Sequence, residues 1–500
     1  MSDQSTVSSH PSLTGVHSGR LFVGSCLSLI ATSVAFAVIG DIMGSLKSQF
    51  ILTNEQVGWI GGAALWGFTI SIIALGPLCD ALGMKRLLGF AFVCHIAGPS
   101  IMIFANGFGM LFAGALILAL GNGTVEAVCN PLVATLYPDN KTTMLNRFHV
   151  WFPGGIVLGG LACFVLGLLG VMSWKVRLVL VMIPAVIYGY LMLSQKFPVT
   201  ERVQSGVSFG GMVKATFGRP LFLIMFLCMG ITASLELGPN RWIPSILQSG
   251  GMHGILVLVW ISGLMAVLRF FAGPFVHKFS PTGLLLCSSL LGGAGLFWLS
   301  YAESITMALA AATVFALGVC YFWPTMLGVV AERIPRGGAL ALAMMGGIGM
   351  LASGMIASPL IGKVADDHLK DKLDTAATTA VIQKIADEFP SLQAAAPGAL
   401  GKDFQPGIDS AKQVLEKIKA AGGALPHPDT ANALRAAIGS GAKADVVKEA
   451  ADILNPADNY GGRLSFRVIA PSAIVLVIVF GVMYIDDRRK GGYKVEKIGN

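Results

Sequence analysis

Apolar residues along this chain gather into twelve runs, which are separated by polar stretches. A helix needs about 20 residues to cross the hydrocarbon core of a bilayer, and each run is close to or above that length. The runs cover residues 21–44, 57–75, 87–105, 110–136, 148–170 and 176–194, and then 221–247, 254–276, 283–301, 304–330, 338–362 and 465–485. The pattern predicts an all-α membrane protein with twelve transmembrane helices.

Polar stretches divide the predicted helices into two sets of six. We expect a tail at 1–19, a six-helix bundle at 20–194, a linker at 195–220, helices 7 to 11 at 221–362, an insertion at 363–463, helix 12 at 464–485 and a basic tail at 486–500. The sets echo each other, because Gly76-Pro77 matches Gly273-Pro274 and Pro131 matches Pro324. Two pseudo-symmetric bundles with a substrate site between them are the plan of many secondary carriers.

The insertion at 363–463 is rich in alanine and charged residues and contains helical patterns such as 411–419. A loop of this length is usually either functional or disordered. We predict a small helical domain and keep a disordered tether as the alternative. Because an odd number of helices precedes the insertion, we expect it on the side of the membrane opposite both chain ends.

Basic residues favour one side of the membrane. One alternating set of short loops carries most of them: Lys85, Arg86, Lys141, Lys196, Arg202, Lys214, Lys278, Arg333 and Arg336. The opposite set has little beyond Lys47 and Lys175. Since cytoplasmic loops are enriched in Lys and Arg, we expect both termini in the cytoplasm, the insertion outside, and the chain in the inner or plasma membrane.

Composition excludes a soluble domain, because 54% of the 500 residues are hydrophobic and 12% are charged, against about 25% charged in soluble proteins. The net charge of +8 follows the loop distribution and does not indicate nucleic-acid binding. The eight cysteines lack zinc-site spacing, and the sequence has no glycine-rich phosphate loop or nucleophile elbow. We therefore expect no metal site, no cofactor and no enzymatic activity.

Glu126 is the single charged residue in the apolar run from 110 to 137. An acidic residue at the centre of a membrane helix costs about 2.5–3.5 kcal/mol on insertion scales, so it usually serves an ion or proton pathway. Glu126 and Asn130 are four residues apart and share a helix face, and Pro131 permits a kink. Asp41 interrupts the first run in the same way. For either acid, a structural pair with Arg or His is the alternative.

Other candidates for substrate binding are polar or aromatic residues within the predicted spans: Asn130, His149, Trp151, Glu236, Asn240, Tyr321 and Trp323. Gly238 and Pro239 are expected to break the helix that carries Glu236, and broken helices mark binding sites in carriers. The alternative for His149 is a satisfied residue at a helix end, and for the aromatic residues it is packing. Arg241 offers a structural partner for Glu236.

The turn from Gly76 to Arg86 carries the pattern Gly76-x-Leu78-x-Asp80-x-x-Gly83-x-Lys85-Arg86. It resembles the signature loop of the major facilitator superfamily. The resemblance implies a cytoplasmic gating loop in which Gly76 and Gly83 allow close approach and a tight turn, and Asp80 latches one state. Ala81 replaces the usual Arg, which leaves part of that charge network in doubt. Arg269, which precedes Gly273, resembles the superfamily's structural Arg and is not expected to be a ligand.

Three further strings resemble the fucose:proton symporter family: 40–58, 121–131 and 322–325. The resemblance implies that Asp41 and Glu126 are proton-coupling residues beside a sugar pocket. His149 departs from it, since that family has Gln there. A carboxylic acid holds its proton more tightly in an apolar cavity than in water, so alternating access can load and release a proton.

We therefore expect a monomeric carrier that imports a sugar or sugar-like polyol with a proton or another cation. A carrier of a small carboxylate, or an exporter of amphipathic compounds, is the nearest alternative. A second alternative is a membrane receptor that does not transport and uses the insertion as its ligand-binding head.

Overall fold

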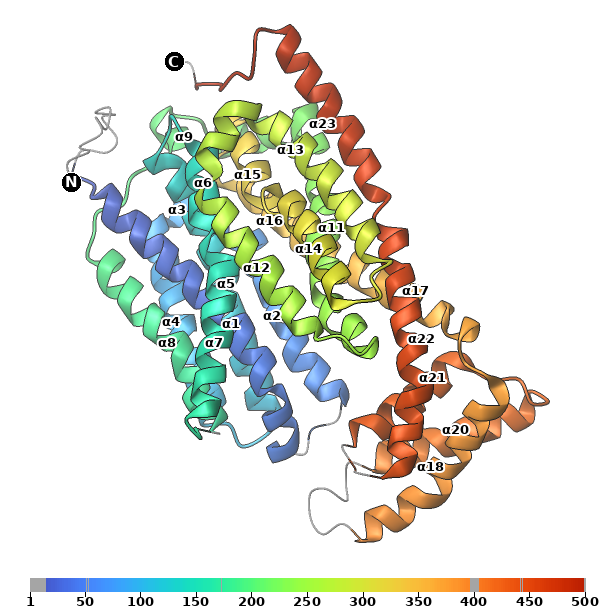
Figure 1. Ribbon diagram of the computed structural model, residues 1–500. Coiled ribbons are helices and arrows are strands. Elements are labelled where there is room, and N and C mark those ends of the chain that lie inside the picture. The colour runs from blue at the N-terminus through green and yellow to red at the C-terminus, as the bar shows by residue number, and fades with distance from the viewer. Residues whose placement is uncertain are drawn as a thin grey trace.

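The computed structural model describes residues 15–498 except 51, 53, 172, 396–403, 441 and 443. In this part of the chain, ten helical stretches are long and apolar enough to cross a membrane, and two shorter apolar helices, Trp59–Leu75 and Gly254–Phe270, complete the predicted twelve. The described secondary structure is helical throughout (Figure 1). The all-α membrane fold is therefore confirmed.

The first six spans form the N-terminal half. Its helices are α1 (Ser18–Phe50), α2 (Asn54–Leu75), α3 (Cys79–Leu82), α4 (Met84–Ile103), α5 (Phe108–Leu136), α6 (Lys141–His149), α7 (Trp151–Leu168) and α8 (Trp174–Leu193). The linker adds the short helices α9 (Glu201–Gln204) and α10 (Phe209–Phe217). Helices α6 and α7 together form the fifth span, with a break at Val150 between them.

The second six spans form the C-terminal half. They are α11 (Pro220–Ser249), α12 (Gly254–Phe270), α13 (Ala272–Leu299), α14 (Ile305–Val319) with α15 (Phe322–Arg333), α16 (Gly338–Ala352) with η3 (Ser353–Ala357) and α17 (Ser358–Asp367), and α23 (Ser472–Arg489). The 3₁₀ turn η2 (Pro335–Gly337) precedes α16. In Figure 1 the start of α1 and the end of α23 lie at the same end of the bundle, which we name the terminal face.

The backbone preserves a trace of the two-fold repeat. Gly83, in the turn before α4, has φ 86° and ψ 137°. Ser280, which lies 197 residues later, has φ 62° and ψ 161° and kinks α13. Positive φ suits glycine and is strained for other residues. The two halves therefore turn the chain in the same way, although the C-terminal half uses a serine.

The insertion is a helical domain with its own core. Its helices are α18 (Thr375–Ala395), α20 (Gln405–Ala420), α21 (His427–Gly439) and the first part of α22 (Asp445–Ile469), after the turn η4 (Leu369–Asp371). Each helix buries one apolar stripe, and their side chains pack together, among them Ile385, Phe389, Val414, Leu434 and Leu454. The predicted helical domain is confirmed over the described residues, which excludes a disordered tether there.

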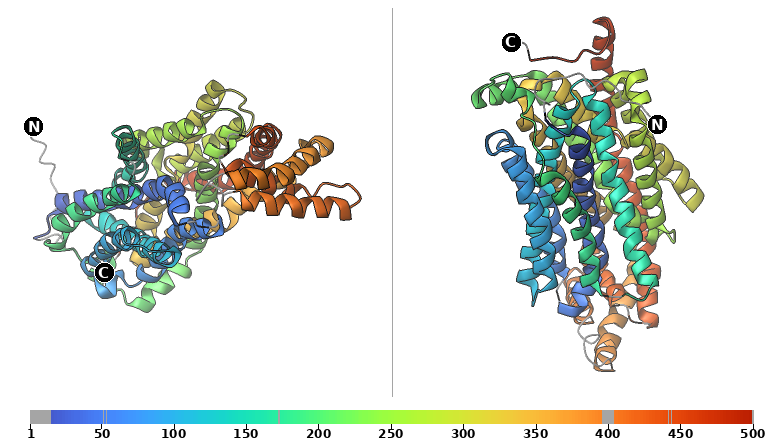
Figure 2. Two further views of the ribbon diagram at one scale, coloured as in Figure 1. Left: turned by 90° about the horizontal axis from the view of Figure 1, so that it is seen from below. Right: turned by 90° about the vertical axis from the view of Figure 1, so that its left-hand side faces the viewer.

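Helix α22 joins the insertion to the last span without a break at residue 463. It buries Leu454, Gly461 and Ser465 on one side, and it packs along α17, which extends the eleventh span beyond 362. Because this spacing keeps one face buried, the helix continues from the insertion into the bundle. The insertion therefore projects from the C-terminal half at the end opposite the terminal face, as Figure 2 shows from two sides.

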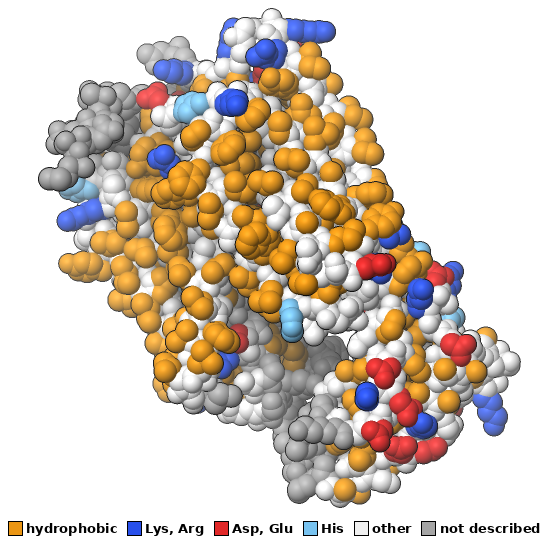
Figure 3. Space-filling model, in the orientation of Figure 1, with side chains coloured by type: hydrophobic (Ala, Val, Ile, Leu, Met, Phe, Trp, Pro, Cys, Tyr) orange, Lys and Arg blue, Asp and Glu red, His pale blue; other side chains and the backbone are white. Residues whose placement is uncertain are grey.

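The outer surface of the bundle is apolar. Ile474, Ile478 and Val482 of α23 are 60%, 60% and 63% exposed, and they follow one helix face. Figure 3 shows hydrophobic side chains over the bundle, with charged side chains gathered near its ends and on the insertion. An exposed apolar belt of this kind suits lipid, so the chain is a multi-pass membrane protein.

Candidate functional site

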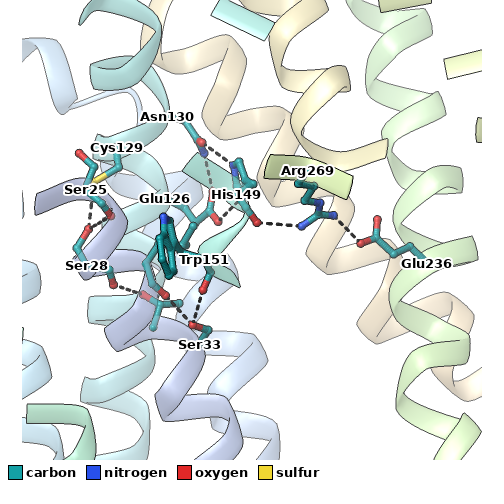
Figure 4. Close-up of polar contacts among 12 residues, drawn as sticks. Ser25, Ser28, Ser33, Glu126, Cys129, Asn130, His149, Trp151, Glu236 and Arg269 are labelled. Carbon is teal, nitrogen blue, oxygen red and sulfur yellow. Dashed lines mark hydrogen bonds and ion pairs between the residues drawn. The ribbon is translucent and has the colours of Figure 1, made fainter. Parts of the chain in front are cut away.

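Glu126 lies deep in the N-terminal half and is held by two partners (Figure 4). The Asn130 amide nitrogen donates to its Oε2 at 2.6 Å, and the Nδ1 atom of His149 lies 3.8 Å from its Oε1. His149 Nε2 lies 3.0 Å from the Asn130 Oδ1 atom. Because that oxygen only accepts, Nε2 is the donor, and Nδ1 of the neutral ring is an acceptor that faces Glu126.

Arg269 of α12 bridges the two halves at the same level. Its Nη2 donates to Glu236 Oε1 at 3.1 Å and its Nη1 to the His149 carbonyl oxygen at 3.2 Å. Its Nε donates to the Cys320 carbonyl oxygen. Arg269 and Glu236 are 2% and 3% exposed. One guanidinium therefore ties α11, α12 and the end of α14 to the end of α6.

A small cavity opens between these groups. Nine residues line it: Phe68, Glu126, His149, Phe152, Glu236, Leu237, Arg269, Trp323 and Met350. They come from both halves of the molecule.

Four of the predicted site residues, Glu126, His149, Glu236 and Trp323, line the cavity, and Asn130 holds two of them from behind. Three further candidates for substrate binding, Trp151, Asn240 and Tyr321, lie outside the lining. Trp151 does not line the cavity, although its neighbour Phe152 does. The Trp151 carbonyl oxygen accepts a hydrogen bond from Ser33. Asn240 lies one turn beyond Glu236 on α11. Tyr321 precedes α15 and donates to the Leu268 carbonyl oxygen.

The structure places Asp41 away from the cavity. Its carboxylate pairs with Arg177 at the start of α8, and its side chain is 36% exposed. The ion pair is the structural alternative to a coupling role for Asp41. The two acids of the sequence hypothesis are therefore not brought together, and a coupling role for Asp41 stays a prediction.

Sequence reasoning did not identify Arg269 as a central residue. The partner of Glu236 is Arg269 rather than Arg241, which is exposed on α11. A charged residue in the apolar run from 254 to 276 was a signal of the same kind as Glu126. The aromatic residues Phe68 and Phe152 carried no such signal, since phenylalanine is common in every span.

The signature loop is anchored to the linker. Asp80 accepts from Thr200 Oγ1 at 2.7 Å and from Arg202 Nε at 2.6 Å. A Cβ atom on Gly76 would overlap Ala343 of α16, so this glycine permits the close contact between halves that the motif predicts. Lys85 and Arg86 are exposed. Ala81 stands where the motif usually has Arg, and the linker residue Arg202 supplies the cation that pairs with Asp80.

Hydrogen bonds between the halves, in the described part of the chain, lie at the level of His149 or nearer the terminal face. Glu332 Oε1 accepts from the Thr142 backbone N–H at 2.9 Å, and Asn146 donates to Thr325 at 3.1 Å. Lys141, which pairs with Glu201 at 2.8 Å, also donates to the Ala331 carbonyl oxygen. The terminal face is thus closed by contacts across the two halves.

The C-terminal tail supports this closure. Tyr493 donates to Glu332 Oε2 at 2.8 Å, and the backbone N–H of Glu496 donates to the Glu332 carbonyl oxygen. Burial and the nearby Glu332 carboxylate raise the pKa of Tyr493 well above its usual value, so the phenol keeps its proton and donates. The tail therefore holds Glu332 in the position from which it binds Thr142.

Replacing Tyr493 with Phe is expected to weaken the closed terminal face. The ring can still lie over Arg333, but the hydrogen bond to Glu332 is lost. A bond to a charged group contributes about 1.5–3 kcal/mol, so the closed population should fall by about tenfold or more relative to the open one. Spin labels at the exposed Arg147 and Arg336, one on each half, would report longer distances. The Tyr190→Phe variant, changed at an exposed ring on α8, is the control; equal distances in both variants would contradict the role of the tail.

Comparison with known proteins gives the same picture of the fold. The family model described as Major Facilitator Superfamily matches residues 21–367. The 2-nitroimidazole transporter of Escherichia coli is 23% identical over 71% of this chain and 90% of its own length. The cis,cis-muconate transport protein of Acinetobacter baylyi is 26% identical over 47% of this chain and 60% of its own length.

Among solved structures, FucP in the outward conformation aligns with a TM-score of 0.59 and 18% identity, over 69% of this chain and 92% of that chain. FucP is a fucose:proton symporter of Escherichia coli. At this identity the similarity establishes the fold and no more. Because the family model covers most of the chain, from the first span to the end of α17, this protein belongs to the Major Facilitator Superfamily.

Proposed function

We propose that this transporter carries a small molecule together with a proton by alternating access, and that Glu126 is the group that binds the proton. The observation that carries the proposal is the position of Glu126, which is 2% exposed yet lines the cavity between the halves. A buried carboxylate in a membrane span is costly unless it has a role of this kind. Asp41 is less well placed, because Arg177 binds it outside the cavity.

The contacts of Glu126 provide a route from proton binding to movement of the halves. Asn130 fixes the His149 ring so that its Nδ1 atom accepts toward Glu126, and a proton can be shared between the two groups. The carbonyl oxygen of the same histidine is bound by Arg269 from the other half. A change of charge at Glu126 therefore acts on His149 and, through it, on Arg269, which bridges the halves. Opening of the terminal face would let water reach the carboxyl group, which favours its ionised form.

A sugar or a sugar-like polyol is the first candidate substrate. The fold is shared with a fucose:proton symporter, and the cavity combines acidic side chains with Trp323, on which the C–H face of a sugar ring can stack. A small carboxylate is the second candidate, because Arg269 lines the cavity and one relative is named for muconate transport. We propose import, with the terminal face in the cytoplasm.

Uptake into proteoliposomes tests proton coupling. An inward proton gradient should drive accumulation of a transported substrate, by about tenfold for one proton and one pH unit, which is worth about 1.4 kcal/mol. A sodium gradient of equal size should not. Uptake that responds to neither gradient would exclude cation symport.

Removal of the insertion separates a carrier from a receptor. Replacing residues 373–455 with a short Gly-Ser linker joins η4 to α22 where they already contact, since Lys372 lies 5.0 Å from the ring centre of Tyr460. Pro456 would then begin the shortened helix, a position that proline tolerates. We expect gradient-driven uptake to persist, because the cavity contains no residue of the insertion. Complete loss of uptake from a folded protein would favour the receptor.

A further inference from the structure

We infer that the central cavity selects an uncharged ring compound that offers both a hydrogen-bond donor and an acceptor, and that it rejects carboxylates. The inference rests on the proposed transport function and specifies the substrate class at the same site. It assigns Glu236 and Trp323 as the residues that recognise the two polar groups.

Two buried polar atoms of the cavity lining lack a hydrogen-bond partner in the described structure: Glu236 Oε2 and Trp323 Nε1. The carboxylate oxygen can only accept and the indole N–H can only donate. Glu236 and Trp323 are 3% and 8% exposed, so neither atom is freely solvated. A buried polar atom without a hydrogen-bond partner costs free energy of folding. A ligand that supplies one donor to Glu236 Oε2 and one acceptor to Trp323 Nε1 would satisfy both atoms.

The charge of the lining disfavours an anion. Arg269 is the one cationic side chain of fixed charge among the nine lining residues. Its three nitrogen atoms donate to protein oxygens on Cys320, His149 and Glu236, which uses three of its five N–H groups. A ligand carboxylate would therefore have to share the guanidinium with Glu236, its ion-pair partner, and it would lie near the carboxyl groups of Glu126 and Glu236.

The remaining lining selects for a ring. Phe68, Phe152 and Trp323 contribute three aromatic side chains to the lining, and Leu237 and Met350 contribute two aliphatic ones. Aromatic faces bind flat rings and the C–H face of sugars. The shared chemistry is thus an uncharged ring with a donor and an acceptor, which both a neutral sugar and a neutral heterocyclic amide provide.

Matched pairs of neutral and anionic compounds test the inference on the purified full-length protein. D-glucose against D-glucuronate, and nicotinamide against nicotinate, each differ in charge at nearly constant ring shape. Binding would be followed by ligand-induced shifts of the thermal midpoint and by intrinsic tryptophan fluorescence. In whichever pair binds, we expect the neutral compound to bind about tenfold more tightly than the anionic one. Binding of the sugar pair or of the nicotinamide pair shows which of the two kinds of ring the cavity accepts.

Trp323→Phe keeps the aromatic ring and removes only the N–H donor. It should raise the Kd of the neutral ligand by about tenfold, the usual effect of one lost hydrogen bond. Trp260→Phe is the matched control, because the Trp260 N–H donates to Thr313 on the outer side of α12. Tighter binding of the anionic member, or an unchanged Kd in Trp323→Phe, would overturn the inference. Transport that prefers the neutral compound but does not respond to the proton gradient would instead contradict the proposed coupling, and the inferred substrate class would still hold.

Discussion

Glu126→Gln is expected to abolish accumulation of substrate against its gradient in proteoliposomes. Gln has nearly the same shape, and its carbonyl oxygen can still accept from Asn130, so the fold of α5 should not change. The amide cannot exchange a proton near neutral pH, so no proton accompanies the substrate. With a gradient of one pH unit, the accumulation ratio should fall from about ten to about one.

Exchange transport distinguishes this result from simple inactivation. Counterflow of labelled substrate requires the halves to alternate but needs no net proton movement, so the Glu126→Gln variant should retain it. Glu416→Gln, changed at an exposed position on α20 in the insertion, is the matched control and should accumulate substrate normally. Accumulation that survives in Glu126→Gln would show that the proton binds elsewhere, and Asp41 would then be the next residue to test.

Arg269→Met is expected to have the largest effect on stability. The change leaves the Glu236 carboxylate buried without its cation and removes donors from the carbonyl oxygens of His149 and Cys320. Breaking a buried ion pair on one side costs about 3–5 kcal/mol, because an uncompensated charge remains. The thermal midpoint of the purified protein should fall sharply, and uptake should be lost.

A double variant tests whether the charge of Glu236 causes the loss. Arg269→Met with Glu236→Gln removes both charges, so most of the lost stability should return. Transport should stay impaired, because the bridge to His149 is still missing. Arg241→Met, at an exposed position on the same helix as Glu236, serves as the single-site control. An equally low midpoint in the single and double variants would assign the effect to the carbonyl contacts instead.

The twelve spans were predictable because a membrane helix needs a long apolar run, and such runs have clear ends. Residues 110–136, for example, correspond to α5 at Phe108–Leu136. Breaks inside a span were harder to predict. The run from 304 to 330 divides near Tyr321 into α14 and α15, and this division directs Trp323 into the cavity while Tyr321 bonds to α12.

Charges in apolar runs identified the site only in part. Glu126 and Asp41 gave the same signal, yet their depth and partners differ: one lines the cavity and the other pairs with Arg177. Burial costs can be read from a sequence, but the partner that offsets them lies on another helix. Arg269 shows this most clearly, since its importance depends on Glu236 and on a carbonyl oxygen 120 residues away.

Helix α22 has a consequence for how the movement of this transporter could be observed. It passes from the core of the insertion into the bundle, and Asn459 on it donates to the Ile246 carbonyl oxygen of α11 at 2.7 Å. Arg435 of α21 adds ion pairs to Asp366 and Asp458. The water-exposed domain is thus clamped to one half of the carrier and free of covalent links to the other. It offers an antibody or a fluorophore an attachment site beyond the membrane that reports the tilt of the C-terminal half, without any label inside the translocation path.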